Sequence, residues 1–286
     1  MQIVAPVFLL AAIGWIWVRA GFEYRIRFVT QLAMTLSVPC LVFNAMQNSR
    51  IDPASLSAVS LAVVASYAAV TVAMALVVMA LRLRMQTFLA PLIFGNTGNL
   101  GLPLAFFAFG EQGLGYAAVI FAIMAVYSFS AGVWLVSGGG SPVKALKEPM
   151  VWAAILGVVF LWNGWHTPVF LTNTLQLIGQ MAIPLMLITL GVALARLTPD
   201  RMIRPFLLSL GKVAICAAIA WTIGRYLKLD PVAFGVLVLQ ISTPVAVTSY
   251  LLAEKYQADS DSVAGLVVAS TLVSVVTLPL ILAVVI

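Results

Sequence analysis

Residues 93–104 place polar and helix-breaking residues in the middle of a long apolar stretch. They read Ile-Phe-Gly-Asn-Thr-Gly-Asn-Leu-Gly-Leu-Pro-Leu. Glycine and proline interrupt helices, and interrupted backbone at membrane depth occurs only where protein or a water-filled cavity surrounds it. Such helices build the binding sites of secondary transporters. The segment therefore predicts an interruption of the helix within residues 93–104 and a solute site, for which the candidate substrate-binding residues are Asn96, Thr97, Asn99, Gly101 and Pro103.

Residues 240–249 form a second candidate interruption and read Gln-Ile-Ser-Thr-Pro-Val-Ala-Val-Thr-Ser. Pro244 removes a backbone donor, and nearby side chains could satisfy the groups that it frees. A kinked helix packed in a bundle is an equally good interpretation of this segment alone. If the two interruptions cross, the N-terminal ends of the following half-helices favour an anion. The candidate substrate-binding residues here are Gln240, Ser242, Thr243, Pro244 and Thr248.

Lys212 is the only ionisable residue well inside a predicted span, and an intramembrane charge is a functional hypothesis by default. Lys212 could neutralise an anionic substrate or stand in for a coupling cation. The alternative is snorkelling, in which the ammonium reaches the lipid headgroups, because Lys212 lies roughly 10 Å from the cytoplasmic edge of its span. Tyr67 could line the same site or bond to a neighbouring helix.

Enzyme chemistry is not expected. No Asp, Glu or His lies well inside a predicted span, so a nucleophile–base pair or a metal cluster is missing there. We predict no catalytic residue, no metal and no cofactor. Cys40 and Cys216 should be free thiols, because they lack metal-ligand spacing.

Composition predicts an all-α polytopic membrane protein. Hydrophobic residues make up 63% of the chain and charged residues 8%, against about 45–50% and about 25% in soluble domains. Spans of about 20 residues give ten transmembrane helices, at roughly 2–18, 28–46, 57–80, 86–109, 114–137, 149–164, 168–194, 205–224, 231–253 and 262–286.

The positive charge is distributed unevenly, which sets the expected orientation. Loops after the odd-numbered spans carry eleven Lys and Arg residues, and loops after the even-numbered spans carry three. Because cytoplasmic loops hold the excess of Lys and Arg, we predict a multi-pass protein of the cell inner (plasma) membrane with both termini outside. This distribution explains the net charge of +6 without nucleic acid as a partner. Residues 1–18 are interpreted as a retained span.

The chain repeats weakly at an offset of 145 residues. The offset places Pro39 on Pro184, Asn99 on Pro244 and Tyr67 on Lys212. Five spans is an odd number, so the second copy would enter the membrane from the opposite side, as in inverted repeats with crossing broken helices 4 and 9. The predicted divisions are a first repeat at 1–137, a short cytoplasmic linker at 138–148 and a second repeat at 149–286.

At these motifs the chain resembles the auxin efflux carrier (PIN-like) family, which has many bacterial members. The resemblance covers nearly the whole length, and the pattern at 95–103 is its most specific part. Thr248 departs from it, since many bacterial relatives carry Asn there. The long cytoplasmic loop of plant carriers is absent. Further matches lie at 106–110, 147–149, 182–185, 243–246, 252–256, 270–274 and 277–279.

The resemblance implies a fold similar to that of bile-acid/sodium symporters. Spans 1, 2, 6 and 7 would form a scaffold and a homodimer interface, and the other spans a mobile domain. It also implies elevator-type alternating access and organic-anion substrates, such as auxin in plants or malonate and malate in bacteria.

We therefore expect a secondary active transporter of small organic anions, carboxylates or auxin-like acids, with the lipid bilayer as its surroundings. A sodium-coupled symporter of the bile-acid type is the nearest alternative, and a channel is a further one, since broken helices also build filters. The spans supply only neutral oxygens, which favours proton coupling or uniport over sodium.

Overall fold

All regular secondary structure in the described part of the chain is helical. The computed structural model describes residues 5–47, 53–132, 149–196, 202–247, 249–250, 253 and 258–286. The α-helices are α1 (Ala5–Arg19), α2 (Ile26–Leu32), α3 (Val38–Gln47), α4 (Pro53–Ala80), α5 (Met85–Ile93), α6 (Leu102–Tyr127), α8 (Pro149–Asn163), α9 (Val169–Gln180), α10 (Ala182–Arg196), α11 (Ile203–Tyr226), α12 (Pro231–Ile241) and α14 (Ser260–Val285). Three π-helical turns join them: η1 (Ala33–Ser37), η2 (Thr97–Gly101) and η3 (Ser128–Gly132).

Six helical segments of the described chain are long and apolar enough to cross a membrane. They are Ile26–Gln47, Ala54–Ala80, Thr97–Tyr127, Val169–Arg196, Ile203–Tyr226 and Ser260–Val285. The helices α1 and α12 are apolar but shorter. The prediction of an all-helical polytopic protein is thus confirmed at this level, whereas the count of ten spans and the inverted repeat stay predictions.

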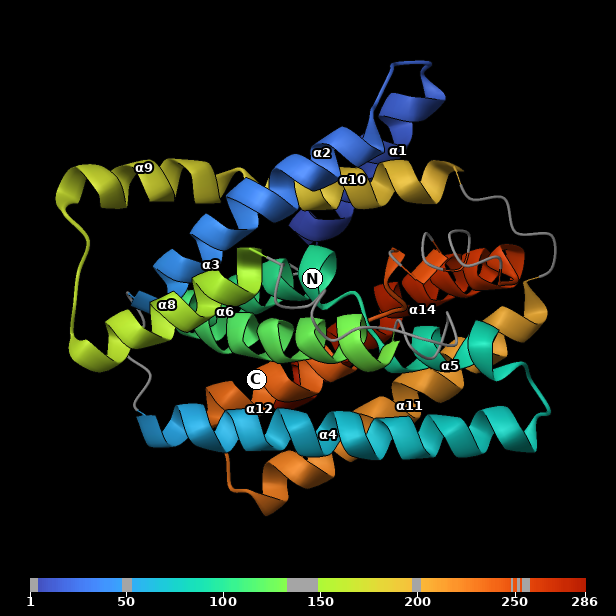
Figure 1. Ribbon diagram of the computed structural model, residues 1–286. Helices are drawn as coiled ribbons and strands as arrows, with labels where there is room; N and C mark the ends of the chain where they lie inside the picture. Colours follow the sequence, from blue (N-terminus) through green and yellow to red (C-terminus); the bar gives the residue numbers. More distant parts are fainter. Residues whose placement is uncertain are drawn as a thin grey trace.

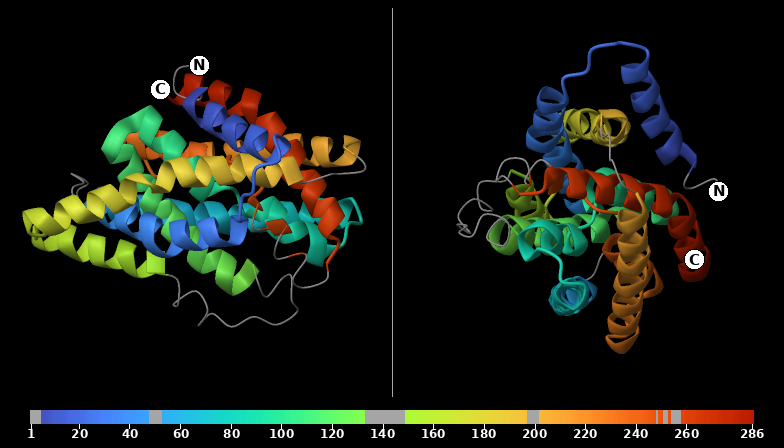
Figure 2. Two further views of the ribbon diagram at one scale, coloured as in Figure 1. Left: turned by 90° about the horizontal axis from the view of Figure 1, so that it is seen from above. Right: turned by 90° about the vertical axis from the view of Figure 1, so that its right-hand side faces the viewer.

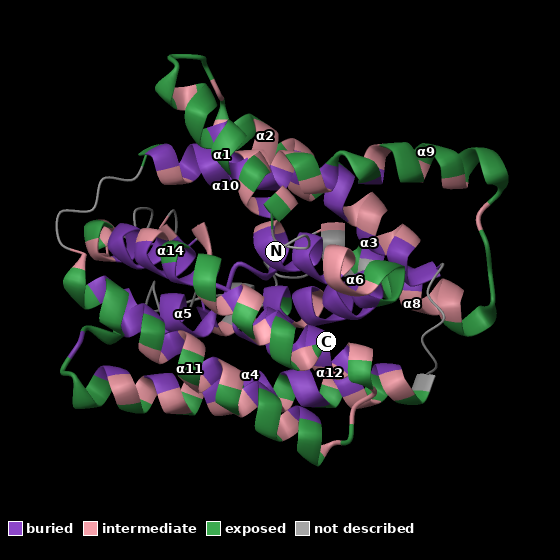
Figure 3. Ribbon diagram, turned by 180° about the vertical axis from the view of Figure 1, so that it is seen from behind, coloured by how far each residue is buried: buried purple, intermediate pink, exposed green. Residues whose placement is uncertain are grey.

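Large apolar side chains are exposed along several helices, whose exposed residues are green in Figure 3. On α9, the side chains of Val169, Phe170 and Leu177 are 76%, 74% and 68% exposed. On α4, large apolar side chains such as Leu61 and Val72 are also exposed. Water would disfavour apolar patches of this kind, and lipid tails would not, so these faces suit a bilayer.

The helices pack in two groups. One group contains α1 against α10 and α3 against α8 and α9; the other contains α4, α5, α6, α11, α12 and α14. The two groups lie on opposite sides of the molecule, with α1, α2 and α10 on one side and α4 and α11 on the other (Figures 1 and 2). They meet where α6 contacts α3 and α8, and where η2 contacts α10.

The first group is held by a close backbone contact between α1 and α10. A Cβ atom at Gly14 would collide with the carbonyl oxygen of Ile188, and one at Gly191 would collide with that of Ala11. Small residues allow membrane helices to approach closely enough for many van der Waals contacts. Glycine is therefore required at both positions for steric reasons.

The second group contains a bend and two capped helices. Gly110 interrupts α6 with φ 64° and ψ −154°, between the predicted spans 86–109 and 114–137. At the start of α12, Asp230 accepts hydrogen bonds from the amides of Val232 and Ala233. At the start of α14, hydrogen bonds from the Ser262 hydroxyl and amide hold the pKa of Asp259 below its ordinary value.

The Asp230 carboxylate also joins two helices of this group. Its second oxygen accepts a 2.8 Å hydrogen bond from the hydroxyl of Tyr116 on α6. One side chain thus caps α12 and fixes its start against α6. This contact holds the helix that leads into the second interruption.

Candidate functional site

The first interruption is shorter than the sequence predicts. After α5 ends at Ile93, Phe94 is extended with φ −88° and ψ 119°, and Asn96 has φ −80° and ψ 55°. The π-helical turn η2 then begins at Thr97. The break predicted within 93–104 is therefore present but limited to its first residues, because hydrogen bonds such as Gly101 N to Asn96 O at 3.0 Å close a helical turn from Thr97 onward.

The second interruption pairs directly with the first. The helix α12 ends at Ile241, and Val245 forms an isolated antiparallel β-bridge with Gly95. The amide of Asn96 donates to the carbonyl of Pro244 at 2.6 Å, and the amide of Ala246 donates to that of Phe94 at 3.4 Å. The kinked-helix interpretation of 240–249 is wrong, because residues 242–246 do not continue the helix α12. We call residues 94–96 and 243–246 the crossing.

Two glycines make the crossing possible. A Cβ atom at Gly95 would collide with the hydroxyl of Thr243, and a Cβ at Gly101 would collide with the amide oxygen of Gln240. Both pairs join the α5–η2 segment to the end of α12. The close approach of these two segments explains why glycine stands at both positions.

A cavity of about 80 Å³ lies beside the crossing, between the two groups of helices. Asn96 and Asn99 contribute polar side chains, and the side-chain amide nitrogen of Asn96 (Nδ2) is buried without a hydrogen-bond partner. We call this space the crossing cavity. Its other lining residues are Gly95, Gly98, Ala246 and Val247 at or near the crossing, Phe121 and Met124 on α6, Ile26, Thr30 and Met34 on α2 and η1, and Thr189 and Ala193 on α10.

A larger pocket of about 830 Å³ adjoins the crossing cavity, and we call it the vestibule. The two spaces share Ile26, Thr30, Met34, Ala193 and Val247 as lining residues. The charged residues of the vestibule are Arg25, Arg27, Arg196 and Glu23. Basic side chains therefore surround the approach to the crossing.

Contacts at the α1–α2 connection order one wall of the vestibule. Arg196 donates to the carbonyl of Tyr24 at 2.6 Å, and Arg25 pairs with Glu23 at 2.7 Å. The Tyr24 hydroxyl lies 2.7 Å from that of Thr189. Burial raises the pKa of Tyr24 despite this hydrogen bond, so the hydroxyl stays neutral at physiological pH.

Lys212 points into the protein. Its side chain is 2% exposed, and its ammonium donates a 3.0 Å hydrogen bond to the carbonyl of Thr243. The snorkelling interpretation is therefore wrong. Lys212 does not line the crossing cavity, and neither do Gln240, Ser242 and Thr243.

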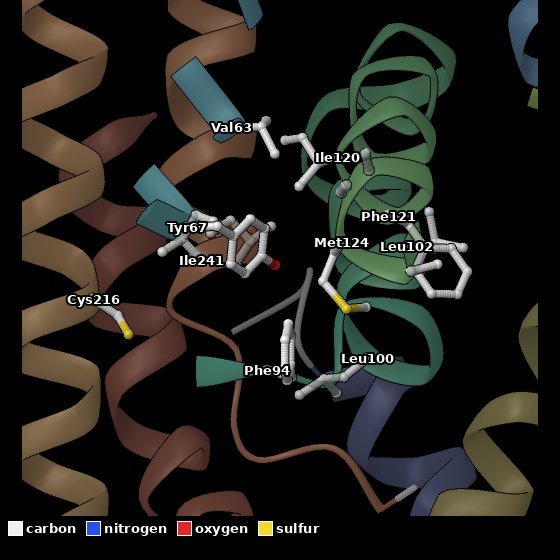
Figure 4. Packing of buried hydrophobic residues seen from close by; sticks show 14 of the residues in the cluster. Val63, Tyr67, Phe94, Leu100, Leu102, Ile120, Phe121, Met124, Cys216 and Ile241 are labelled. Carbon is white, nitrogen blue, oxygen red and sulfur yellow. The ribbon is translucent and has the colours of Figure 1, made fainter. Parts of the chain in front are cut away.

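Tyr67 belongs to an aromatic cluster against the first interruption. Its ring centroid lies 6.3 Å from that of Phe94 and 6.2 Å from that of Tyr127. Figure 4 shows Tyr67, Phe94 and Met124 together among the buried side chains of the core. The Tyr67 hydroxyl is buried and has no hydrogen-bond partner. Tyr67 therefore packs the crossing and does not line its cavity.

The structure thus divides the predicted substrate-binding residues. Asn96 and Asn99 line the crossing cavity. Thr243 and Pro244 belong to the crossing, and Gly101 and Gln240 lie against each other beside it. Thr97 and Ser242 are buried next to it in the chain, and Pro103 is buried in the first turn of α6. Thr248 lies outside the described residues.

Sequence reasoning missed Thr30, Thr189 and the arginines of the vestibule. A hydroxyl residue within a predicted span is a usable signal, but the sequence does not show which helix face turns toward the site. The described residues contain no group of three or more His, Cys, Asp or Glu that could hold a metal ion.

Apolar helices, a paired interruption and a cavity with a basic approach are typical of multi-pass membrane transporters. Residues 133–282 match the family described as membrane transport protein, and the chain belongs to this family. The resemblance to the auxin efflux carrier family is thereby confirmed. The family consists of transporters and not of enzymes.

Curated relatives agree with this assignment. The chain is 33% identical over 192 residues to an uncharacterized transporter of Methanothermobacter thermautotrophicus, covering 65% of this chain and 63% of that protein. It is 25% identical over 201 residues to one of Methanocaldococcus jannaschii, with 66% and 64% covered. It is also 25% identical over 202 residues to a protein of Rhizobium meliloti named "putative malonate transporter", with 64% and 62% covered. The matches span less than two thirds of each relative.

Proposed function

We propose that the protein is a secondary transporter of small organic anions, and that the crossing cavity binds the carboxylate of the substrate. The observation that carries this proposal is the connection between a basic vestibule and a polar cavity at two interrupted helices. The arginines would raise the local concentration of an anion. The cavity would then select its carboxylate.

The chemistry of the crossing cavity favours an anion. The side-chain amide nitrogen of Asn96 is a buried donor without a partner, and leaving it unpaired costs about 1–3 kcal/mol. A carboxylate oxygen would satisfy it. The helix that begins at η2 also directs its positive dipole end toward this space, and the residues that line the cavity include no Asp or Glu.

The size of the two spaces supports a small acid. About 80 Å³ accommodates a carboxylate group, and the remainder of the substrate would lie in the vestibule. The relative named "putative malonate transporter" supports a dicarboxylate, and an auxin-like acid would place its ring among the apolar side chains of the vestibule.

An elevator movement would carry the site across the membrane. The group containing α4, α5, α6, α11, α12 and α14 holds the crossing, and Thr30, Thr189 and Ala193 come from the other group. Sliding one group past the other would close the vestibule and open the opposite side. The exposed helix α9 of the first group would contribute to a homodimer interface. The inner-membrane location of the protein follows from the charge distribution.

Counterflow in proteoliposomes tests the proposal. Vesicles loaded with unlabelled malonate should accumulate labelled malonate transiently, and other mono- and dicarboxylates should compete. A sodium-coupled symporter would accumulate substrate only with a sodium gradient, and a channel would show no counterflow. Absence of saturable exchange with every carboxylate tested would refute the proposal.

A further inference from the structure

The Lys212 ammonium is a buried charge that the proposed substrate site does not use. Its side chain is 2% exposed, and its hydrogen bond to the Thr243 carbonyl is the contact that holds it. An ammonium has three N–H donors. The one ion pair found among the described residues joins Arg25 and Glu23, so Lys212 has no carboxylate partner there. Burying a charge this way is costly in a membrane protein.

The ammonium lies at the carbonyl end of an interrupted helix. The helix α12 ends at Ile241, and its final carbonyls carry the negative end of the helix dipole. Thr243 follows in the interrupted backbone. In transporters with broken helices, such carbonyl ends coordinate coupling cations. A positive charge is therefore favoured at this position whether it belongs to an ion or to a side chain.

Two neutral oxygens close to Thr243 in the chain remain unused. The amide oxygen of Gln240 and the hydroxyl of Ser242 are 0% and 2% exposed and have no hydrogen-bond partner. Carbonyl, amide and hydroxyl oxygens are ligands for hard cations. With the Thr243 carbonyl, they give three neutral oxygens within residues 240–243. Such oxygens attract a positive charge, and the Lys212 ammonium supplies one at Thr243.

The position of Lys212 argues against direct contact with a substrate. The crossing cavity is lined on the α12 side by Ala246 and Val247. Lys212, Gln240 and Ser242 are absent from its lining. The electrostatic field of the ammonium would reach an anion in the cavity only across the residues of the crossing.

We propose that the Lys212 ammonium occupies a site for a small monovalent cation at the end of α12 and acts as a built-in cation of the crossing. Removing the ammonium would leave the oxygens of Gln240, Ser242 and Thr243 free to bind Na⁺ or a short alkylammonium ion. The wild-type protein then needs no Na⁺ to keep the crossing intact. The consequence that transport is sodium-independent rests on the proposed function, whereas the cation site does not.

Thermal unfolding of the purified protein tests the site without any substrate. Wild type, Lys212→Ala, Lys212→Met and the surface control Lys228→Gln are melted in NaCl, KCl, methylammonium chloride and choline chloride at equal ionic strength. Lys228 is exposed at the end of α11. Wild type and the control should melt at the same temperature in all four salts. The Lys212 variants should melt lower in choline and should recover by about 2–4 °C or more in Na⁺ or methylammonium, because a ligand that binds the folded state stabilises it.

Three results would overturn the inference. The first is stabilisation of wild type by Na⁺ over choline, which would mean that the cation site is not filled. The second is equal melting of both Lys212 variants in every salt. The third is failure of both variants to fold in every salt, because the proposal requires a small cation to replace the ammonium. Loss of carboxylate counterflow in wild type would refute the proposed function and leave this result untouched.

Discussion

The backbone amide of Asn96 donates a 2.6 Å hydrogen bond to the carbonyl of Pro244, so each interruption satisfies a polar group that the other exposes. An unpaired amide or carbonyl in lipid would cost several kcal/mol. The two interruptions therefore depend on each other, and a change that separates them should destabilise both. This dependence underlies the first prediction.

Replacing Gly101 by alanine should loosen the crossing. A Cβ atom there would collide with the Gln240 amide oxygen, and overpacking of this kind costs about 1–3 kcal/mol. The melting temperature should fall by several degrees and transport should decrease. Gly211→Ala is the matched control, since a Cβ at Gly211 on α11 meets no atom within 4 Å. Equal melting of the two variants would contradict the geometry of the crossing.

Asn99→Ala should abolish or strongly reduce transport while the protein still folds. Asn99 lines the crossing cavity and is only partly buried, so its amide is available to a substrate. Losing one such contact costs about 1–3 kcal/mol, or roughly 5- to 150-fold in affinity. Uptake and ligand-induced thermal shifts measure both effects. The control Asn163→Ala removes an exposed amide that bonds only within α8, and near-normal uptake by Asn99→Ala would show that the site lies elsewhere.

Arg27→Gln should weaken the capture of an anion in a salt-dependent manner. Arg27 lines the vestibule and is exposed, so it acts on a substrate through a field that salt screens over about 8–10 Å. We expect KM to rise at low ionic strength and the difference from wild type to shrink in high salt, with little change in maximal rate. Arg82→Gln removes an exposed charge outside the vestibule lining. The same KM change in that variant would argue against a role of the vestibule.

Tyr116→Phe should destabilise the protein without a direct effect on substrate binding. The Tyr116 hydroxyl donates to the Asp230 carboxylate at 2.8 Å, and a hydrogen bond to a charged group contributes about 1.5–3 kcal/mol. The melting temperature should fall by about 3 °C or more, and substrate affinity should be retained. Tyr226→Phe is the control, because Tyr226 is 83% exposed. If both variants melt like wild type, the contact does not hold α12.

Cysteine labelling checks the predicted orientation. With Cys40 and Cys216 replaced by alanine, His166→Cys should react with an impermeant maleimide from outside the cell. Arg82→Cys should react only after permeabilisation, because the loop after the third predicted span belongs to the strongly basic set that marks the cytoplasmic side. Labelling of both from one side would refute the topology and the inverted repeat together.

Several features could be predicted because their causes are local. Glycine, asparagine and proline within an apolar stretch predict an interruption without knowledge of any partner, and the structure interrupts the chain at 94–96. The length of that interruption was not predictable, because η2 is closed by backbone hydrogen bonds back to Asn96. Such bonds depend on where the opposing segment holds Asn96.

The sequence by itself determined that the chain is a helical membrane protein and that a helix breaks near residues 93–104, because apolarity, proline and glycine act on neighbouring backbone. Only the tertiary structure decided which side chains share the site. Thr30 and Thr189 lie on helices of different halves of the chain, and both line the crossing cavity. Lys212 turns inward because the Thr243 carbonyl, held by the crossing, offers it an acceptor. Contacts between such distant residues depend on how helices pack and rotate, which no local pattern specifies.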